Sequence, residues 1–470
     1  MIKVRGFGAN PEYDRTLRSV GPRGGFGNFE WTAELSGLRT RSPVAADLLR
    51  VGRAVHLADR LVRRSVSISR NLRRINVEVT VAEPAKWRRM ASLLEELAEF
   101  ATGGDSWSLS FAGGATDDVL IGNGDGGADV EPTVVALFSG GLDSLCGAAH
   151  LAAQKNSRPL FVTHSPPGRK AVYGLVQDVF RAFGREPPTG ACVSYRLELR
   201  EAVRSGVRSM FPESSRRTRP FFYLSLASAT AIAYEVSTVQ MSENGALALS
   251  LPYRADAHGP SMARQAHTFL LTGFETLLRE LVPGVRWAVT NPFVNETKGE
   301  ACLRLGPAGK LAKRSASCEY LGRQRAVMLS WKRKHPRWAK MFGNGPQCGL
   351  CVPCIIRRAA LRRARIADPD AAYFASAREV LAGVRRRDTA LHFFAEKDPP
   401  PLMNMLAPNV LYMERHCDWL ASADLSEFAV QYLPELRANR HPNGVPEIDV
   451  GAYHELTRRY AREILAFLHG

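Results

Sequence analysis

Residues 139–144 of this 470-residue chain read Ser-Gly-Gly-Leu-Asp-Ser and directly follow a short, mostly apolar run. The run 133–138 predicts a buried strand and the residues from Leu145 onward predict a helix, so the hexapeptide joins the end of a strand to the start of a helix. Free backbone N–H groups and the helix dipole at such a junction attract phosphate. Gly140 and Gly141 allow a positive φ and a close approach of the main chain to a pyrophosphate. The hexapeptide therefore predicts a loop that binds the phosphates of a nucleotide.

The polar side chains of the hexapeptide extend this prediction. Ser139 and Ser144 add hydroxyl donors, and the backbone of Leu142 belongs to the same loop. Asp143 would repel phosphate unless a cation lay between them, which predicts Mg²⁺. The loop has neither the lysine nor the spacing of a Walker motif. A glycine-rich turn with a serine cap is the alternative interpretation, but such a turn needs no carboxylate and no second hydroxyl.

A second group of reactive side chains consists of Cys348, Cys351 and Cys354, which follow one another at three-residue intervals. Two cysteines at this spacing close around one metal ion, and Cys318 is the nearest candidate for a fourth ligand. Four thiolates with no open position predict a structural Zn²⁺ site. An iron–sulfur cluster is a second interpretation, and unligated core cysteines are a third. The other cysteines are isolated in the sequence and are predicted to be core residues: Cys146, Cys192, Cys302 and Cys417.

The elements that must position these residues alternate between strands and helices. Predicted strands cover residues 133–138, 159–164, 191–197, 237–241 and 285–290. Predicted helices lie near residues 144–155, 170–183, 220–236 and 263–281. Strands that are apolar on both faces and separated by helices predict an α/β fold, with a parallel, doubly wound sheet covered on both sides. Such sheets bind ligands at the carboxyl ends of their strands, where the hexapeptide lies.

The rest of the chain is predicted to form further parts around an α/β domain of residues 133–300. Residues 1–111 predict an N-terminal α+β domain, with helical patterns at 47–64 and 87–101 and alternating strand patterns at 75–81 and 107–111. Residues 112–132 are rich in Gly and Asp and predict a linker. Residues 301–366 are predicted to be a helical subdomain that holds zinc, and residues 367–470 a helical C-terminal extension.

Composition limits the class of protein. The net charge of +17 favours anionic partners such as nucleotides, nucleic acid or an acidic protein surface. No apolar run is long enough to span a membrane, and the N-terminus lacks the apolar core of a signal peptide, which predicts a cytoplasmic protein without a membrane partner. Eight cysteines in so long a chain do not make a disulfide scaffold, and clustered ones favour metal binding.

The hexapeptide after an apolar strand resembles the PP-loop of the ATP pyrophosphatases, and residues 133–360 carry the resemblance. The resemblance implies an enzyme that binds ATP and Mg²⁺ at this loop, adenylates a carboxylate, carbonyl or ureide oxygen, and releases pyrophosphate. It also implies contacts to the nucleotide after the second strand, at His164, Arg169 and Lys170. A solvated loop explains these three residues equally well.

A PP-loop upstream of the four cysteines is similar to the 7-cyano-7-deazaguanine synthase (QueC) family, whose members carry a structural zinc site. Residues 291–300 extend the resemblance, because Pro292, Thr297, Lys298 and Glu300 match the Pro…Thr-Lys-x-Glu segment of that family. The resemblance implies activation of the carboxylate of 7-carboxy-7-deazaguanine and transfer to an amine. Thr297 and Glu300 also have the spacing of a helix capping box.

The resemblance assigns roles to individual side chains. Asp143, Ser144 and Lys298 are the predicted catalytic residues, with Lys298 as a cation near the nucleotide or the carboxylate. Glu243 and Asn244 follow the predicted strand 237–241 and have polar groups that can read a deazapurine ring. A plain Asn-Gly turn explains Glu243 and Asn244 as well.

The chain departs from the short, housekeeping members of the family. Those members lack its N-terminal domain and its long C-terminal helical part, and their first cysteine lies closer to the other three. Long QueC-like proteins occur in bacterial antiphage operons, and the resemblance to them implies an antiviral defence role. It also implies a changed acceptor, a protein amine such as the N-terminus of an operon-encoded partner, in place of ammonia. The sequence does not determine whether the product is an amide or a nitrile.

Two other functions remain open from the sequence. A PP-loop enzyme that thiolates tRNA is supported by the positive charge and by basic runs at residues 331–340 and 384–388. Such an enzyme needs an iron–sulfur cluster or a reactive cysteine pair near the loop, and Cys146 has no evident partner in the sequence. A non-catalytic nucleotide-binding subunit is the other alternative, and the intact hexapeptide argues against it.

Overall fold

The structure is a computed structural model of the whole chain. It describes residues 2–6, 14–20, 23–26, 29–36, 42–62, 64, 72–114, 131–164, 169–187, 192–201, 213, 217–249, 264–319, 325–336, 343–385, 403–437 and 449–470. Among these residues, no helix has the length and apolarity needed to cross a membrane.

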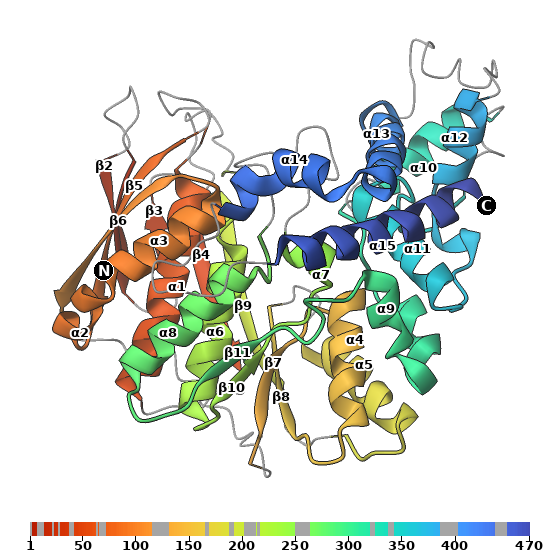
Figure 1. Cartoon of the computed structure of the whole chain (residues 1–470). Helices are drawn as coiled ribbons and strands as arrows, with labels where there is room; N and C mark the ends of the chain where they lie inside the picture. Colours follow the sequence, from red (N-terminus) through yellow and green to blue (C-terminus); the bar gives the residue numbers. More distant parts are fainter. Residues whose placement is uncertain are drawn as a thin grey trace.

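A parallel sheet forms the centre of the molecule (Figure 1). Its strands are β7 (Val134–Leu137), β8 (Pro159–Thr163), β9 (Cys192–Glu201), β10 (Thr238–Gln240) and β11 (Ala288–Thr290). Their spatial order is β11-β10-β7-β8-β9, and every neighbouring pair is parallel. This confirms the predicted α/β fold with a parallel sheet. The chain moves from β7 outward to β9 and then returns to β10 on the other side of β7, which makes the end of β7 a switch point where ligands bind.

Helices cover both faces of this sheet, as the doubly apolar strands require. On one face lie α4 (Leu142–Ala153) and α5 (Arg169–Ala182), and on the other lie α6 (Arg219–Ala233) and α8 (Thr268–Leu281) (Figure 1). Alternate residues of β7 belong to different cores, because Val134 and Ala136 pack with α4 and α5 whereas Val135 packs with α6 and α8. The buried strands therefore separate two hydrophobic layers.

The N-terminal strands continue the same sheet. They are β1 (Ile2–Gly6), β2 (Asp14–Val20), β3 (Arg23–Phe26), β4 (Phe29–Ser36), β5 (Arg74–Val81) and β6 (Ser106–Gly113). β4 pairs antiparallel with β9, so the described strands form one eleven-stranded sheet that crosses the predicted domain boundary. Sequence patterns predicted β5 and β6 but not β1–β4. Inward residues of β5 are fully buried and alternate with partly exposed ones, as its strict alternation predicts.

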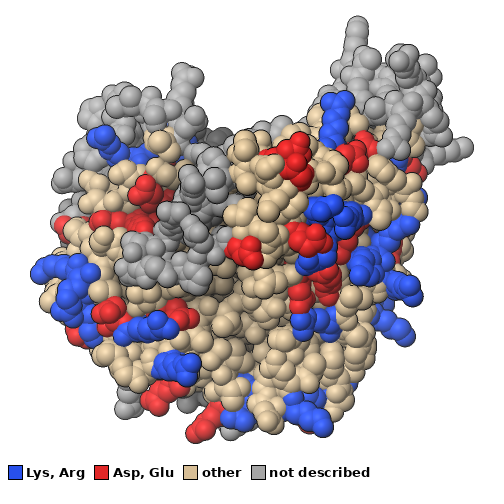
Figure 2. Space-filling model, in the orientation of Figure 1, with Lys and Arg blue, Asp and Glu red and all other residues tan. Residues whose placement is uncertain are grey.

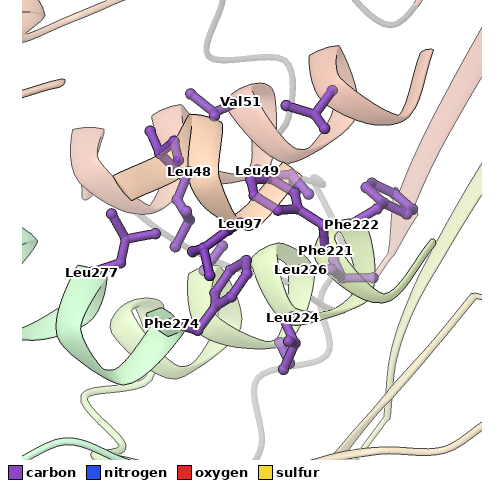
Figure 3. Close-up of a cluster of buried hydrophobic side chains, with 14 of the residues drawn as sticks. Leu48, Leu49, Val51, Leu97, Phe221, Phe222, Leu224, Leu226, Phe274 and Leu277 are labelled. Carbon is purple, nitrogen blue, oxygen red and sulfur yellow. The ribbon is translucent and has the colours of Figure 1, made fainter. Parts of the chain in front are cut away.

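Three helices pack on the N-terminal strands: α1 (Pro43–Leu61), α2 (Pro84–Arg89) and α3 (Ala91–Thr102). Helix α1 lies against α6, where Gly52 permits the approach, because a Cβ atom there would stand 2.5 Å from the Oγ of Ser225. Figure 3 shows the apolar side chains that meet between these helices, with Leu97 of α3 and Phe274 of α8 closing the cluster. The N-terminal elements and the central sheet therefore share one hydrophobic core.

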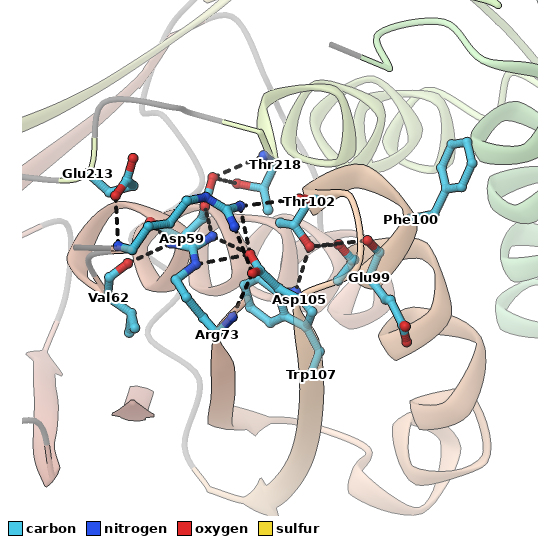
Figure 4. Close-up of polar contacts among 12 residues, drawn as sticks. Asp59, Val62, Arg73, Glu99, Phe100, Thr102, Asp105, Trp107, Glu213 and Thr218 are labelled. Carbon is cyan, nitrogen blue, oxygen red and sulfur yellow. Dashed lines mark hydrogen bonds and ion pairs between the residues drawn. The ribbon is translucent and has the colours of Figure 1, made fainter. Parts of the chain in front are cut away.

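A buried ionic network also joins these parts (Figure 4). The Nη2 of Arg73 donates to Oδ1 of Asp59 at 2.6 Å and to Oδ2 of Asp105 at 2.5 Å. The backbone N–H and hydroxyl of Thr218, the cap residue of α6, donate to Oδ2 of Asp59. Burial acts to raise the pKa of Asp59, but the Arg73 guanidinium outweighs it and lowers that pKa. The network therefore holds charged groups from α1 and from the segments before β5 and β6, together with the cap residue of α6, in one place.

Removing Arg73, the arginine that joins Asp59 with Asp105, should be costly even though Arg64 also pairs with Asp105. Arg73→Ala leaves Asp59 and Asp105 buried with fewer partners, and we expect the free energy of unfolding to fall by about 3–5 kcal/mol. Arg74→Ala, which changes the exposed neighbour, is the matched control and should change stability by less than about 0.5 kcal/mol. Urea unfolding of both variants measures the difference. Equal stability of the two variants would contradict the assigned role of Arg73.

The remaining helices form a layer beside and above the carboxyl edge of the sheet (Figure 1). They are α7 (Gly245–Ala248), α9 (Lys298–Leu303), η5 (Gly306–Arg314), α10 (Arg325–Lys334), α11 (Val352–Arg363), η7 (Asp370–Ala372), α12 (Ala377–Arg385), α13 (Met403–Ser422), α14 (Leu425–Arg437) and α15 (Val450–His469). Helix α15 contacts α13, α11, α9 and α7. Elements from the predicted zinc subdomain and the predicted extension therefore share one core around α15.

Candidate functional site

The predicted phosphate loop lies where β7 ends and α4 begins. The N–H of Phe138 still donates to the carbonyl of Val162 on β8, and the chain leaves the sheet at the next residue. Gly140 has a φ of +77°, a conformation that glycine adopts without strain, and Gly141 is the cap residue of α4. The side chain of Leu142 is buried in the core, so only its main chain is placed to contact a ligand.

The two serines of the loop face each other. The Oγ atoms of Ser139 and Ser144 lie 3.3 Å apart, and the Ser139 Oγ accepts from the N–H of Gly141 at 3.3 Å. The Ser144 hydroxyl lies 2.9 Å from the carbonyl of Gly141, to which it donates. These contacts hold the loop in a compact turn, in which Ser139 is exposed and Ser144 is buried.

Asp143 forms an ion pair with Lys298. The Lys298 Nζ lies 2.5 Å from Oδ2 of Asp143, and the side chains are only 4% and 13% exposed. Burial opposes the charge on each group, but the pairing outweighs it. The Lys298 ammonium lowers the pKa of Asp143, and the carboxylates of Asp143 and Glu243 raise the pKa of Lys298. Two of the three predicted catalytic residues, Asp143 and Lys298, are therefore charged and joined at the loop.

The start of helix α9 sets the position of Lys298. Thr297 caps this helix: its hydroxyl accepts from the N–H of Glu300, and the Glu300 carboxylate accepts from the N–H of Thr297. The predicted capping box is thus present. Because Lys298 is the first residue of α9, the capping box also fixes the residue that pairs with Asp143.

Glu243 and Asn244 follow β10, beside the loop. The Asn244 amide nitrogen lies 3.1 Å from Oδ1 of Asp143 and 3.0 Å from Oε1 of Glu243, and it donates to both. The Asn244 side-chain oxygen accepts from the N–H of Leu247 and so caps α7. Burial, and then the charge of Asp143, raise the pKa of Glu243 well above its usual value. The structure therefore brings both residues to the Asp143–Lys298 pair.

Two close backbone approaches bring these loops together. A Cβ atom at Gly147 would lie 2.2 Å from the Oγ of Ser242, and one at Gly245 would lie 2.0 Å from the carbonyl oxygen of Val294. Asn291, which directly follows β11, accepts from the N–H of Glu243 and donates to its carbonyl. Sequence analysis did not single out Ser242 or Asn291, although each lies just beyond a strand at the carboxyl edge of the sheet.

His164 and Arg169 follow β8, the strand that pairs with β7. His164 directly follows β8, and its ring packs among the rings of Tyr195, Phe222 and Tyr223 at centroid distances of 6.4, 5.6 and 5.6 Å. Arg169 is the first residue of α5, and its side chain, like that of Lys170, lies outside the described part of the structure. His164 therefore stands at the carboxyl edge, but the described contacts do not connect it with Asp143.

The predicted metal ligands lie together. The Sγ atoms of Cys318, Cys348, Cys351 and Cys354 all lie within 4.8 Å of one another, and the last three residues are buried. Tetrahedral Zn–S bonds of about 2.3 Å separate sulfur atoms by about 3.8 Å, and the Sγ atoms of Cys348 and Cys354 are 3.9 Å apart. These four cysteines therefore form a closed cluster that can hold a zinc ion.

The backbone around the cluster suits thiolates. The N–H of Cys348 donates to the Cys318 sulfur at 3.3 Å, and the N–H of Cys351 donates to the Cys348 sulfur at 3.2 Å. Such bonds orient metal ligands and stabilise their charge. Gly349 has a φ of +82°, and a Cβ atom there would lie 1.9 Å from the carbonyl of Ala375. The knuckle between the first two cysteines of the trio therefore requires glycine.

Helix α11 connects the cluster with the loop. Arg357 is buried, and its guanidinium donates to the carbonyl of Ala312 and the hydroxyl of Ser315, each at 2.7 Å. Just beyond these residues, the carbonyl of Ala316 stands 3.7 Å from the position of a Cβ at Gly141. The segment that leads to Cys318 is therefore held against the predicted phosphate loop.

A cysteine pair that the sequence did not indicate lies beneath the loop. The sulfur atoms of Cys146 on α4 and Cys302 on α9 are 3.9 Å apart, and both residues are fully buried. Burial, and then the contact with Cys302, raise the pKa of the Cys146 thiol well above its usual value. A reactive cysteine needs an exposed site and a lowered pKa, so the geometry fits a packed thiol pair.

Comparisons with known proteins find no relative of the chain: no family model, no curated protein and no solved structure matches it. The similarity to the PP-loop enzymes and the QueC family therefore rests on the motifs of the sequence, and it stays a prediction.

Proposed function

We propose that this protein is an ATP-dependent ligase of the PP-loop type that adenylates a carboxylate and transfers the acyl group to an amine. The buried Asp143–Lys298 pair carries the proposal, because it is built at a Ser-Gly-Gly turn on the switch point of a parallel sheet. A buried ion pair contributes little to stability compared with apolar residues of the same size. Stability alone therefore does not explain this pair. Binding of a ligand that carries both negative and positive charge, such as ATP with Mg²⁺, would explain why a carboxylate and an ammonium lie together at a phosphate-attracting loop.

The chain's own groups suit this reaction. The N–H groups of the loop and the hydroxyls of Ser139 and Ser144 would bind the phosphates, and the ammonium of Lys298 would stabilise negative charge as it develops. Bound Mg²⁺, held by Asp143, would neutralise the charge of the triphosphate. Catalysis would come from positioning and electrostatic stabilisation, which need preformed donors and a dry site.

The bond changes are those of an acyl transfer through an adenylate. An oxygen of the substrate carboxylate attacks the α-phosphorus of ATP, the bond between this phosphorus and the bridging oxygen breaks, and pyrophosphate leaves. The amine nitrogen then attacks the acyl carbon, AMP leaves with the bonding electrons, and the nitrogen loses a proton. The proposed acid is 7-carboxy-7-deazaguanine, with Glu243 and Asn244 near its ring. The proposed acceptor is ammonia or the N-terminal amine of a partner protein, in a defence role.

Zinc is the metal we propose for the cysteine cluster, with a structural role. Four thiolates close the coordination shell, which leaves no position for a substrate or a water molecule. The cluster would fix the segment that contacts Gly141 and so support the loop.

An oxygen-isotope experiment tests the reaction directly. The protein is incubated with ATP, Mg²⁺ and 7-carboxy-7-deazaguanine labelled with ¹⁸O in its carboxylate, together with ammonium or a peptide that has a free N-terminus. Pyrophosphate release and one ¹⁸O atom in the AMP product are expected. ATP cleavage to ADP, or AMP without the label, would refute carboxylate adenylation. A mass gain on the peptide would identify a protein-type acceptor.

Thiolation of tRNA is the second candidate, because Cys146 does have a cysteine partner in the structure. The raised pKa and complete burial of Cys146 argue against sulfur transfer through it. Figure 2 also shows Lys and Arg mixed with Asp and Glu on the described surface of one face, not gathered into one basic patch. Incorporation of ³⁵S into tRNA by the purified protein, lost in Cys146→Ser, would favour this candidate over the ligase.

A further inference from the structure

The C-terminal helix α15 lies across the elements that carry the site. At the end of α7, the carbonyl of Leu249 accepts from the hydroxyl of Tyr453 of α15 at 3.3 Å. On α9, Oε1 of Glu300 accepts from the Nε of Arg459 of α15 at 2.9 Å, so the helix contacts the capping box directly. Helix α15 begins more than 140 residues after α9 in the sequence, yet it touches the end of α7 and the start of α9, the two short helices beside Asp143.

Glu463 of α15 makes the closest of these contacts. Its Oε1 accepts from the hydroxyl of Thr297 at 2.6 Å, and its Oε2 accepts from the N–H of Gly299 at 3.2 Å. The two donors lie immediately before and after Lys298. A Cβ atom at position 299 would stand 2.7 Å from either carboxylate oxygen, so glycine permits this approach. The carboxylate of Glu463 thus binds the residues on both sides of Lys298, through the side chain of Thr297 and the backbone of Gly299.

We infer that Glu463 is a positioning residue of the proposed ligase, which fixes the Lys298 ammonium against Asp143 by binding the two residues that flank Lys298. This inference rests on the proposed function and assigns a part in it to the C-terminal helix. Glu463 acts through Lys298 and not on the substrate itself. A lysine side chain has four rotatable bonds, so its ammonium is held in place only when the backbone at its root is fixed. The buried carboxylate supplies this fixation with two hydrogen bonds.

The surroundings of Glu463 make its charge sensitive to pH. Burial raises the pKa of Glu463 to about 7, and the neighbouring Glu300 adds to the rise. The facing cation is Arg363 of α11, whose Nε lies 3.8 Å from Oε1, and the hydrogen bonds from Thr297 and Gly299 also favour the charged form. When the Glu463 carboxylate is protonated, one of its oxygens no longer accepts a hydrogen bond, so the contact with Thr297 or with Gly299 is weakened. The activity of the wild type should therefore rise with pH through about 7.

The test uses the full chain and four proteins: wild type, Glu463→Ala, Glu463→Gln and Glu455→Gln. Glu455 is exposed on the same helix and serves as the matched control. The first measurement is the pH profile of pyrophosphate release, with kcat and KM for ATP. The second is reductive methylation of Lys298, read by mass spectrometry. The second needs no turnover, because a buried ammonium paired with a carboxylate reacts slowly whether or not ATP is cleaved.

We expect Glu463→Ala to lower kcat at least tenfold, to leave KM for ATP within threefold, and to increase methylation of Lys298 at least threefold. Glu463→Gln, which keeps the shape, should be intermediate and should lose the ionisation near pH 7. Glu455→Gln should match the wild type in all respects. Circular dichroism shows whether each variant is folded. If Glu463→Ala is unfolded, the pH profile, kcat and Lys298 methylation of Glu463→Gln test the inference.

The outcomes separate this inference from the proposed function. An active wild type with unchanged kcat and unchanged Lys298 methylation in the Glu463 variants overturns the inference and leaves the ligase intact. A wild type that never cleaves ATP overturns the proposed function and with it the role in catalysis. In that case, methylation of Lys298 still shows whether Glu463 holds this side chain.

Discussion

Asp143→Ala is expected to lower the rate of ATP cleavage between the α- and β-phosphorus by on the order of 10³-fold. The substitution removes the carboxylate that holds the Lys298 ammonium and that would hold Mg²⁺ beside the phosphates. Asp143→Asn keeps the shape of the side chain but removes its charge, and it should lose nearly as much activity. Pyrophosphate release measured under single-turnover conditions reads the chemical step itself. A non-catalytic subunit would keep its function after either change.

Stability must be separated from catalysis in this experiment. Asp143→Ala leaves Lys298 buried without its carboxylate partner, and breaking such a pair costs about 3–5 kcal/mol. The double variant Asp143→Leu with Lys298→Met replaces both charges by apolar groups and should recover most of this loss. It should remain inactive. Recovery of activity together with stability would mean that the pair serves folding alone.

Cys351→Ser is expected to remove the bound metal and to unfold the helices around the cluster. A structural zinc ion contributes on the order of 10 kcal/mol to the folding of small zinc domains. The cluster belongs to the same core as α11, α13 and α15, so its loss should spread through them. Metal analysis of the purified protein and thermal unfolding followed by circular dichroism measure both effects. Because α15 also holds the start of α9, pyrophosphate release should fall as well.

The control for the cysteine change is Cys417→Ser. Cys417 is fully buried in the same core but lies outside the cluster. Burying its hydroxyl should cost about 1–3 kcal/mol and leave the metal content unchanged. Equal metal content and equal melting of the two variants would contradict the metal site. If metal analysis finds iron and the purified protein is brown, the cysteines hold an iron–sulfur cluster and the proposal of zinc is wrong.

The site could be predicted in part because some of it is local in sequence. Residues 139–144 contain a strand end, two glycines, two hydroxyls and a carboxylate, and the trio of cysteines has the spacing of metal ligands. The capping box at Thr297 and Glu300 follows from the same kind of local spacing. Hydrophobic periodicity likewise placed the strands of the parallel sheet to within a few residues at most ends.

The strands β1–β4 were not predicted, although β1–β2, β2–β3 and β3–β4 pair with their neighbours along the chain. The two pairings that build these strands into the sheet are not local, because β1 pairs with β5 and β4 pairs with β9. β4 completes its ladder with β9, more than 150 residues away, and strand sequences depend on such partners more than helix sequences depend on theirs. The sequence analysis placed a domain boundary near residue 111, but the sheet continues across this boundary. The pairing of β4 with β9 that joins the two parts is not local, so the sequence patterns did not indicate it.

The sequence by itself determined which chemical groups are present: a Ser-Gly-Gly loop between a strand and a helix, an acid, a lysine and a cysteine cluster. Only the tertiary structure decided which groups meet. It joined Asp143 with Lys298, bridged Asp143 and Glu243 through Asn244, and brought Glu463 to the two residues that flank Lys298. These partners lie on elements about 100 residues or more apart from Asp143, and the packing of helices over the sheet sets their distances. The spacing of residues along the chain does not predict such contacts. Each contact depends on how distant helices and strands pack, and this packing is driven by burial of apolar surface throughout the core.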